Sequence, residues 1–213
     1  MDGNNRWSKL NSQTKLKSYT NGAEKILKIT EFIFKNYEEV KYISAFALSN
    51  NNLNRSKIII NTLKKVFQNF LDQIDRLDNY PFNITFKGDL SFLDKKILNK
   101  INKIKPLDKR KKNLIIFVNY SGRKDIEMSY KKKLKDKISF NNFKIIKHLS
   151  TKDLPDPDIL IRTGGFRRIS DFLLYQLAFT ELYFLNVLWP NISNNNVRNV
   201  INSYMKTSRK FGL

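Results

Sequence analysis

The chain has 213 residues, of which 41% are hydrophobic and 13% aromatic, so it is long enough to bury a core and too apolar to be disordered. It contains no cysteine, which excludes a disulfide framework and thiolate chemistry. Its 40 lysine and arginine residues against 19 acidic residues give a formal charge of +21, which suits nucleic acid, anionic lipid or phosphorylated substrates as partners. No zinc-finger, RNP-type or P-loop pattern accompanies this charge, so we expect no nucleic-acid partner. Abundant Lys, Asn and Ile are typical of AT-rich genomes, and we favour this bias in composition as the origin of the positive charge.

The chain opens with a polar segment, which argues against a signal peptide and favours a cytoplasmic protein. The stretch 171–189 is apolar enough to suggest a membrane span, but it contains Glu181. An acid at the centre of a bilayer costs about 2.5–3.5 kcal/mol on insertion scales. We therefore expect 171–189 to be a buried core helix, beginning at Ser170 or Asp171, that leads into a strand.

Met1 to Trp7 reads MDGNNRW, an Asp-Gly-Asn turn ahead of a helix, which alone is weak evidence of function. Beyond it, helical and strand-like apolar patterns alternate along the chain. Helices are expected at 22–36, 56–77, 91–103, 122–136 and 194–208, and strands at 41–49, 82–87, 113–119, 158–162 and the end of 171–189. This alternation predicts an α/β fold with a mostly parallel central sheet and right-handed crossovers.

Polar loops follow three of the expected strands. They are SNNNLNR at 49–55, GDL at 88–90 and NYSGRKDI at 119–126. Parallel strands place such loops on one rim of a sheet, where α/β enzymes bind their ligands. A plain Asn-rich loop is the alternative for 49–55.

The most informative stretch is 154–190, LPDPDILIRTGGFRRISDFLLYQLAFTELYFLNVLWP. Arg162 closes an expected strand, Gly164 and Gly165 allow a sharp turn, and Arg167 and Arg168 precede the expected helix start. Guanidinium groups beside a helix N-terminus suit a phosphate-bearing ligand. The alternative is an ordinary strand-turn-helix unit with a solvated basic loop.

The segments MDGNNRW, DPDILIRTGGFRRIS, FLLYQLAFTELYF and VLWP together resemble the signature of the cis-prenyltransferases, the family of the polyprenyl diphosphate synthases. The resemblance covers essentially the whole chain. It implies a single domain over 1–213, with a central sheet of five to six strands and a hydrophobic tunnel walled in part by the 56–77 helix. It also implies Mg²⁺-dependent condensation of isopentenyl diphosphate with an allylic diphosphate such as farnesyl diphosphate, giving a cis-polyprenyl lipid-carrier precursor for cell walls.

The resemblance further implies roles for individual residues. Asp2 is the match to the family's catalytic residue and would organise Mg²⁺ with Glu181. The allylic diphosphate would bind to Gly3, Asn4, Asn5, Arg6, Trp7, Lys15 and Tyr19. Isopentenyl diphosphate would bind to Arg162, Arg168 and Ser170. Proton removal and substrate positioning would fall to Asn52, Ser49 and Arg55.

Some positions depart from the family pattern. In the family a strand precedes the MDGN motif, whereas this sequence begins at that methionine, so either the start is misassigned or the strand has been trimmed. The family also has other residues at the positions of Lys15, Tyr19, Asn51, Leu53 and Lys210. These departures favour an alternative function as a non-catalytic partner subunit of a prenyltransferase complex. The family also implies a homodimer with peripheral membrane contact. No adjacent aspartate pair occurs, which argues against the trans-type synthases with their DDxxD motif.

Overall fold

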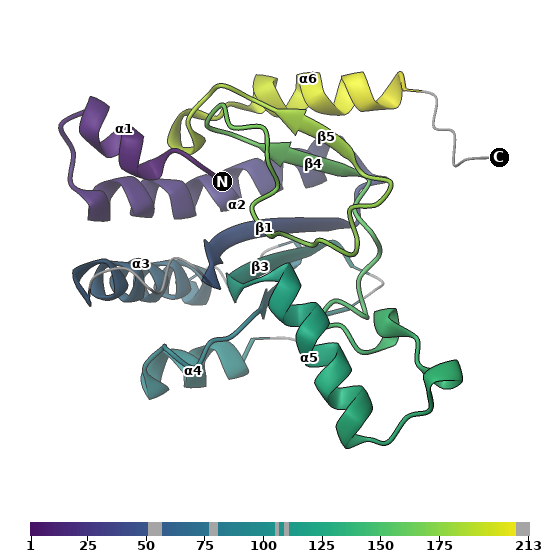
Figure 1. Cartoon of the computed structure of the whole chain (residues 1–213). Coiled ribbons are helices and arrows are strands. Elements are labelled where there is room, and N and C mark those ends of the chain that lie inside the picture. The colour runs from purple at the N-terminus through teal and green to yellow at the C-terminus, as the bar shows by residue number, and fades with distance from the viewer. Residues whose placement is uncertain (51–56, 77–80, 105–106, 109–110, 208–213) are drawn as a thin grey trace.

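The computed structural model of the chain describes residues 1–50, 57–76, 81–104, 107–108 and 111–207. Helices and strands alternate along it, as the apolar patterns predict (Figure 1). The strands are β1 (Tyr42–Ser49), β2 (Asn83–Lys87), β3 (Asn113–Tyr120), β4 (Ile159–Arg162) and β5 (Glu181–Phe184). The α-helices are α1 (Asn4–Leu10), α2 (Lys15–Asn36), α3 (Lys57–Arg76), α4 (Lys95–Asn102), α5 (Gly122–Lys135) and α6 (Asn194–Met205), and the short 3-10 helices are η2 (Phe140–Asn142), η3 (Ile145–Lys147) and η4 (Trp189–Asn191).

The strands form two parallel sheets, not the single sheet of five to six strands that we expected. One sheet has the order β1-β3-β2 and the other pairs β4 with β5 within the described residues. Side-chain packing joins the sheets: Phe46 on β1 stacks on Phe172 at a centroid distance of 4.5 Å, and Ile159 and Ile161 pack against the core of the larger sheet. The expected parallel α/β architecture is confirmed, and the expected single sheet is wrong.

The central strand β3 is buried along its whole length, with Leu114 and Phe117 both 0% exposed. Leu114 and Ile116 face a core cluster with α2, while Ile115 and Phe117 face a second cluster that includes Phe172. Burial on both faces explains why this strand is a continuous apolar run instead of an alternating one. The same packing fixes the carboxyl end of β3 beside the loops of its neighbours.

The helix expected from Ser170 or Asp171 is absent, and turns occupy 170–179 before β5 begins. Ser170, Asp171 and Leu173 have positive φ angles of 52°, 64° and 47°, which a right-handed helix cannot contain. The Asp171 carboxylate accepts the backbone N–H of Arg123 at 3.0 Å, so it caps α5 instead of a helix of its own. The turn thereby ties the β4–β5 unit to the start of α5.

Helix lengths follow local capping. Thr14 accepts the backbone N–H of Lys17 and starts α2 earlier than the expected residue 22. A reciprocal pair of bonds between Ser193 and Asn196 starts α6. In the described part of the chain, no helix combines the length and apolar character needed to cross a bilayer.

Candidate active site at the end of β4

Arg162 lies at the centre of a polar cluster where β4 ends. Its guanidinium donates to Asp2 Oδ2 at 2.8 Å and to Ser170 Oγ at 2.7 Å, and it also donates to the backbone carbonyl of Arg168. The Arg162 side chain is only 11% exposed, whereas Ser170 and Arg168 are exposed, so the guanidinium itself is shielded while its partners face water. One side chain therefore fixes the N-terminal segment and the glycine turn relative to each other.

Asp2 is held by its backbone as well as by its carboxylate. Its N–H donates to Thr163 Oγ1 at 3.0 Å, and its carbonyl accepts from Thr163 Oγ1 at 3.0 Å and from the Trp189 N–H at 2.9 Å. Its other carboxylate oxygen lies 3.7 Å from the Arg6 guanidinium. With a side chain 35% exposed, Asp2 remains accessible to a ligand at the surface.

The glycine turn must approach these residues closely. Gly164 has φ +88°, and its carbonyl accepts from Arg6 at 2.6 Å. A Cβ atom at Gly164 would stand 2.5 Å from an Arg6 nitrogen and 3.1 Å from Asp2 Cβ. Only glycine satisfies both the backbone conformation and the space.

Phe166 lies between two of the arginines. The Arg6 guanidinium carbon is 4.9 Å and that of Arg168 is 4.4 Å from the centroid of the ring. Both distances are in the range of cation–π attraction. The ring thus contacts both the arginine expected to bind the allylic diphosphate and one expected to bind isopentenyl diphosphate.

The start of α1 borders the same cluster. Gly3 precedes the helix with φ +112°, and the first turn carries no acidic side chain. Asn4 Oδ1 is buried without a hydrogen-bond partner in the described structure, while Tyr19 donates from its hydroxyl to Asn5 Oδ1 at 3.3 Å. Exposed N–H groups at a helix start suit an anion.

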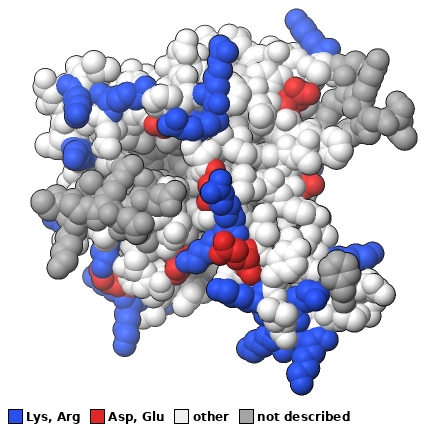
Figure 2. Space-filling view, in the orientation of Figure 1, with Lys and Arg blue, Asp and Glu red and all other residues white. Residues whose placement is uncertain are grey.

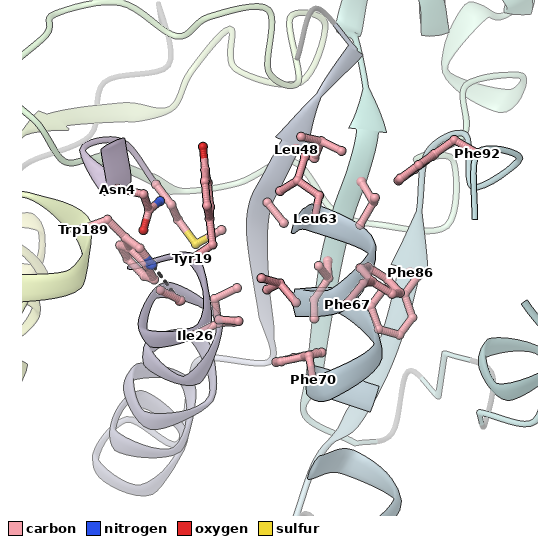
Figure 3. Close-up of a pocket in the computed structure, with 17 residues that line it drawn as sticks. Asn4, Tyr19, Ile26, Leu48, Leu63, Phe67, Phe70, Phe86, Phe92 and Trp189 are labelled. Atoms are coloured by element: carbon pink, nitrogen blue, oxygen red, sulfur yellow. Dashed lines mark hydrogen bonds between the residues drawn. The ribbon is translucent and has the colours of Figure 1, made fainter. Parts of the chain in front are cut away.

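An apolar pocket opens beside this helix start (Figure 3). It encloses about 670 Å³ of empty space, including the part open to solvent. Asn4 and Tyr19 lie at one end, and Phe70 lies towards the other (Figure 3). The remaining lining residues come mainly from α2, α3 and the three strands of the larger sheet: Met1, Gly22, Ala23, Ile26, Ala47, Leu48, Leu63, Val66, Phe67, Phe86, Phe92, Ile116, Val118 and Trp189.

The expected meeting of the strand-end loops is confirmed. Asn50, after β1, donates to Asn119 Oδ1 at 2.7 Å, and Asn119 donates to the Asp89 carbonyl at 2.9 Å. Asn119 has φ +52°, a conformation that asparagine tolerates better than most residues. Hydrogen bonds from Ser91 lower the pKa of the Asp89 carboxyl below its usual value, so this acid stays ionised at neutral pH.

Several expected site residues lie elsewhere. Glu181 starts β5 opposite Ile159, three residues from Arg162, and this separation corresponds to roughly 10 Å along the strand. Lys15 is exposed at the start of α2, and Ser49 closes β1 opposite Tyr120. Trp7 donates to Asn191 at 2.8 Å. Asn52 and Arg55 lie outside the described residues, as do Asn51, Leu53 and Lys210.

The residues present fit Mg²⁺ only in part. In the described ranges, no group of three or more His, Asp or Glu side chains could hold a metal. Asp2 offers one accessible carboxylate, and Mg²⁺ in phosphate-binding sites is commonly held by one or two carboxylates plus substrate oxygens. Asp2 therefore fits a metal that is held mainly by diphosphate oxygens.

Three residues that hold the candidate site together were not singled out from the sequence. Thr163 is 1% exposed and bonds the Asp2 backbone, Phe166 contacts two arginines, and Asn119 joins the strand-end loops. Thr163 and Phe166 lie inside the quoted signature, so their place there was an available signal. Asn119 is the residue at which an apolar strand pattern turns polar.

Comparisons with known proteins agree with this geometry. The family model described as "Putative undecaprenyl diphosphate synthase" matches residues 1–212. An isoprenyl transferase of Aquifex pyrophilus is 34% identical over 218 residues, spanning 100% of this chain and 93% of that protein. A farnesyl-diphosphate-specific undecaprenyl-diphosphate synthase of Buchnera aphidicola is 35% identical over 226 residues, spanning 100% and 88%.

Solved structures show the same fold. Lavandulyl diphosphate synthase from Lavandula x intermedia, crystallised with dimethylallyl diphosphate, aligns over 100% of this chain and 95% of that one, with a TM-score of 0.85 and 27% identity. A probable undecaprenyl diphosphate synthase from Campylobacter jejuni aligns over 91% and 92%, with a TM-score of 0.76 and 27% identity. On the matched residues 1–212 and these relatives, the chain belongs to the undecaprenyl diphosphate synthase family of prenyltransferases.

Proposed function

We propose that the protein condenses isopentenyl diphosphate with an allylic diphosphate, such as farnesyl diphosphate, to give a cis-polyprenyl diphosphate that serves as a lipid-carrier precursor for cell-wall synthesis. The observation that carries this proposal is the arginine cluster around Asp2, whose chain neighbours Met1 and Asn4 line an apolar pocket. A prenyl diphosphate has the same two parts, an anionic head and a hydrocarbon tail. One prenyltransferase domain over residues 1–213 would contain the whole site.

The arginines would hold two diphosphates side by side. Arg6 and the N–H groups of Gly3, Asn4 and Asn5 would bind the allylic diphosphate, with support from Lys15, Trp7 and Tyr19. Arg162, Arg168 and Ser170 would bind isopentenyl diphosphate. Guanidinium forks offset the repulsion between two polyanions and stabilise the charge that develops as the allylic diphosphate leaves.

Mg²⁺ is the cofactor that we propose. Asp2 would hold it together with diphosphate oxygens, whereas Glu181, the second acid expected from the sequence, lies at the other end of the β4–β5 pair from Arg162. When bound, the metal would supply positive charge to the departing diphosphate. The residues of this chain would orient the carbon centres, and Asn52, with Ser49 and Arg55, would assist proton removal.

The pocket would receive the growing hydrocarbon chain. Its walls are mostly apolar side chains of α2, α3 and the larger sheet, so water is excluded along them. Asn4 and Tyr19 lie at one end of the pocket (Figure 3), so a tail that started there would begin beside the proposed diphosphate site. This is the role that we propose for the tunnel expected from the sequence.

A homodimer is our proposed assembly in the cytoplasm. Exposed apolar side chains occur in the turns before β5 and on β5 itself, with Phe179 67%, Tyr175 43% and Leu182 43% exposed. Apolar patches of this kind commonly mark protein interfaces. A second copy covering this patch would remove these side chains from water.

The alternative, a non-catalytic partner subunit, is less well supported. It rests on the departures at Tyr19, Asn51, Leu53 and Lys210. The hydrogen bonds of Arg162 to Asp2 and to Ser170 support the catalytic proposal, and curated relatives over the full chain are named as transferases and synthases.

The test is incorporation of labelled isopentenyl diphosphate into organic-extractable product, with farnesyl diphosphate, Mg²⁺ and detergent. We expect polyprenyl product from the wild-type chain and none above background from the Asp2→Ala variant. Arg198→Ala, on α6 and outside the site, is the matched control and should keep wild-type turnover. A folded wild-type chain with no product would favour the partner-subunit function.

A further inference from the structure

Thr163 follows Arg162 at the end of β4, and both residues bind Asp2. Arg162 bonds the carboxylate of Asp2, whereas the hydroxyl of Thr163 bonds its backbone. The Asp2 N–H donates to Thr163 Oγ1 at 3.0 Å, and Oγ1 donates to the Asp2 carbonyl at 3.0 Å. A hydroxyl accepts and donates at the same atom, which no aliphatic side chain can do. The Thr163 hydroxyl therefore pairs with the Asp2 backbone much as a residue of a neighbouring β-strand would.

The backbone bonds of Asp2 differ from its ion pair in their access to a ligand. Thr163 is 1% exposed, whereas the side chain of Asp2 is 35% exposed and meets Arg162 at the proposed diphosphate site. Because we propose Arg162 for isopentenyl diphosphate, a bound diphosphate would compete with Asp2 for its guanidinium. A ligand at the surface cannot reach the buried hydroxyl of Thr163. Its two bonds to Asp2 would therefore remain when Arg162 turns to the substrate.

The Asp2 carbonyl has a second donor. It accepts the backbone N–H of Trp189 at 2.9 Å, and the indole of Trp189 is fixed in turn by its bond to the Gly22 carbonyl at 2.8 Å (Figure 3). The glycine turn also packs closely here, since a Cβ atom at Gly164 would stand 3.3 Å from the Asp2 carbonyl carbon. Removal of the Thr163 hydroxyl would thus free the N–H of Asp2, while its carbonyl would keep one bond.

A fixed backbone matters for Asp2 because its surroundings are strongly basic. The chain has 40 basic and 19 acidic residues, and Figure 2 shows lysine and arginine side chains spread over one face, with acidic side chains at few places. A carboxylate on a loose segment could pair with several of these cations in different positions. The backbone bonds keep the Asp2 carboxylate where it meets Arg162 at 2.8 Å and Arg6 at 3.7 Å.

We propose that Thr163 is a positioning residue for turnover, whose hydroxyl holds Asp2 where its carboxylate acts as the allylic diphosphate leaves. This inference rests on the proposed function, in which Asp2 serves that departing group. Thr163 is a positioning and not a catalytic residue, because it is buried and acts through Asp2. Misplacing a group that acts mainly in the transition state lowers kcat more than it raises KM. Loss of the hydroxyl should therefore appear in kcat.

Three variants of Thr163 separate its hydroxyl from the rest of the side chain. Thr163→Val keeps the β-branched shape and removes the hydroxyl, Thr163→Ser keeps the hydroxyl and removes the methyl group, and Thr163→Ala lacks both. The matched control is Thr151→Val, because Thr151 is 4% exposed and its hydroxyl accepts from Gln176 instead of bonding Asp2. Each variant is measured by steady-state kinetics of prenyl transfer, by urea denaturation, and by amide hydrogen exchange of Asp2 followed by NMR.

We expect Thr163→Val and Thr163→Ala to lower kcat by roughly tenfold to a hundredfold, the rate equivalent of one or two buried hydrogen bonds, with smaller changes in KM for either diphosphate. Thr163→Ser should retain most of the wild-type kcat. Thr151→Val should lose stability as Thr163→Val does, but should keep the wild-type kcat. The Asp2 amide should exchange faster in Thr163→Val and Thr163→Ala than in the wild type or Thr163→Ser.

Wild-type kcat in Thr163→Val, or an equal loss of kcat in Thr163→Ser and Thr163→Ala, would overturn the proposal. The Ser and Ala variants differ only by the hydroxyl, so they decide the question even if Thr163→Val does not fold. An equal loss of kcat in Thr151→Val would assign the effect to general destabilisation and would overturn it too. Absence of product from the wild-type chain would contradict the proposed function, whereas unchanged exchange of the Asp2 amide in Thr163→Ala would contradict the anchoring by Thr163 in an active or an inactive chain.

Discussion

Arg162 contacts groups more than 150 residues apart in the chain, because it bonds both Asp2 and the turn that follows β4. Lysine would keep the charge but could not reach Asp2 and Ser170 at once, since it lacks the planar fork. We expect Arg162→Lys to lower kcat/KM for isopentenyl diphosphate by roughly tenfold to a hundredfold, the value of one or two charge-assisted hydrogen bonds. Steady-state kinetics with each substrate varied in turn measures this change. Arg198→Lys, on α6, is the control, and a wild-type KM for isopentenyl diphosphate in Arg162→Lys would contradict the assignment.

Substitution of Phe166 tests whether one ring holds the arginines of both diphosphate sites in place. Its ring contacts Arg6 and Arg168, so Phe166→Leu removes both cation–π contacts while keeping an apolar side chain. We expect KM for both diphosphates to rise by about twofold to fivefold, the value of an exposed cation–π contact, with Phe166→Tyr near wild type. A rise for one substrate alone would show that the ring supports only one arginine. Because the ring is 44% exposed, the free energy of unfolding should change little.

At the scale of elements, Asp171 joins the turn after β4 to the start of α5. Its carboxylate accepts the Arg123 N–H and its carbonyl accepts the Gly122 N–H at 2.8 Å, so it caps α5 from outside that helix. We expect Asp171→Ala to lower the free energy of unfolding by about 1 kcal/mol, the usual cost of losing a helix cap. Urea denaturation measures this, and Asp171→Asn, which keeps an acceptor oxygen, is the matched control. Equal stability of Asp171→Ala and wild type would show that the cap contributes nothing.

The same turn marks the limit of prediction from this sequence. A helical apolar period located α2, whose buried residues recur at helical spacing, and a continuous apolar run located β3, which is buried on both faces. The apolar run after Ser170 carries no such information: Phe172 and Leu173 are buried through turns with positive φ, which periodicity does not encode. The division of the strands into two sheets could not be predicted either, because the spacing of strands along the sequence does not tell which strands pair.

At the site, residue identity was predictable and geometry only partly so. The quoted signature contains Asp2, Arg162 and Ser170, which the structure brings together. Glu181 has the expected residue type, but it lies at the opposite end of the β4–β5 pair from Arg162. Which strand end a side chain occupies depends on the pairing register, and the register is set by tertiary contacts that a single sequence does not show.

At the scale of the whole molecule, the pocket lies between α2, α3 and the larger sheet, and Asn4, two residues after Asp2, lines one end of it. Phe70 on α3 lies towards the end away from Tyr19 and is 5% exposed, so it limits the depth open to a hydrocarbon chain (Figure 3). We expect Phe70→Leu to shift the product distribution by one or more isoprene units towards longer chains. Mass spectrometry of the extracted products, with isopentenyl diphosphate in excess, measures the shift.

Phe34→Leu is the matched control for pocket depth. Phe34 is buried to a similar degree, 7% exposed, and packs in the same core against Phe82, but it does not line the pocket. Both substitutions should cost about 1 kcal/mol of folding free energy, because each removes part of one buried ring. If both variants lengthened the products equally, general loosening of the core would explain the change and Phe70 would not limit the pocket. If only Phe70→Leu did so, the position of the ring at the end of the pocket would set the product length.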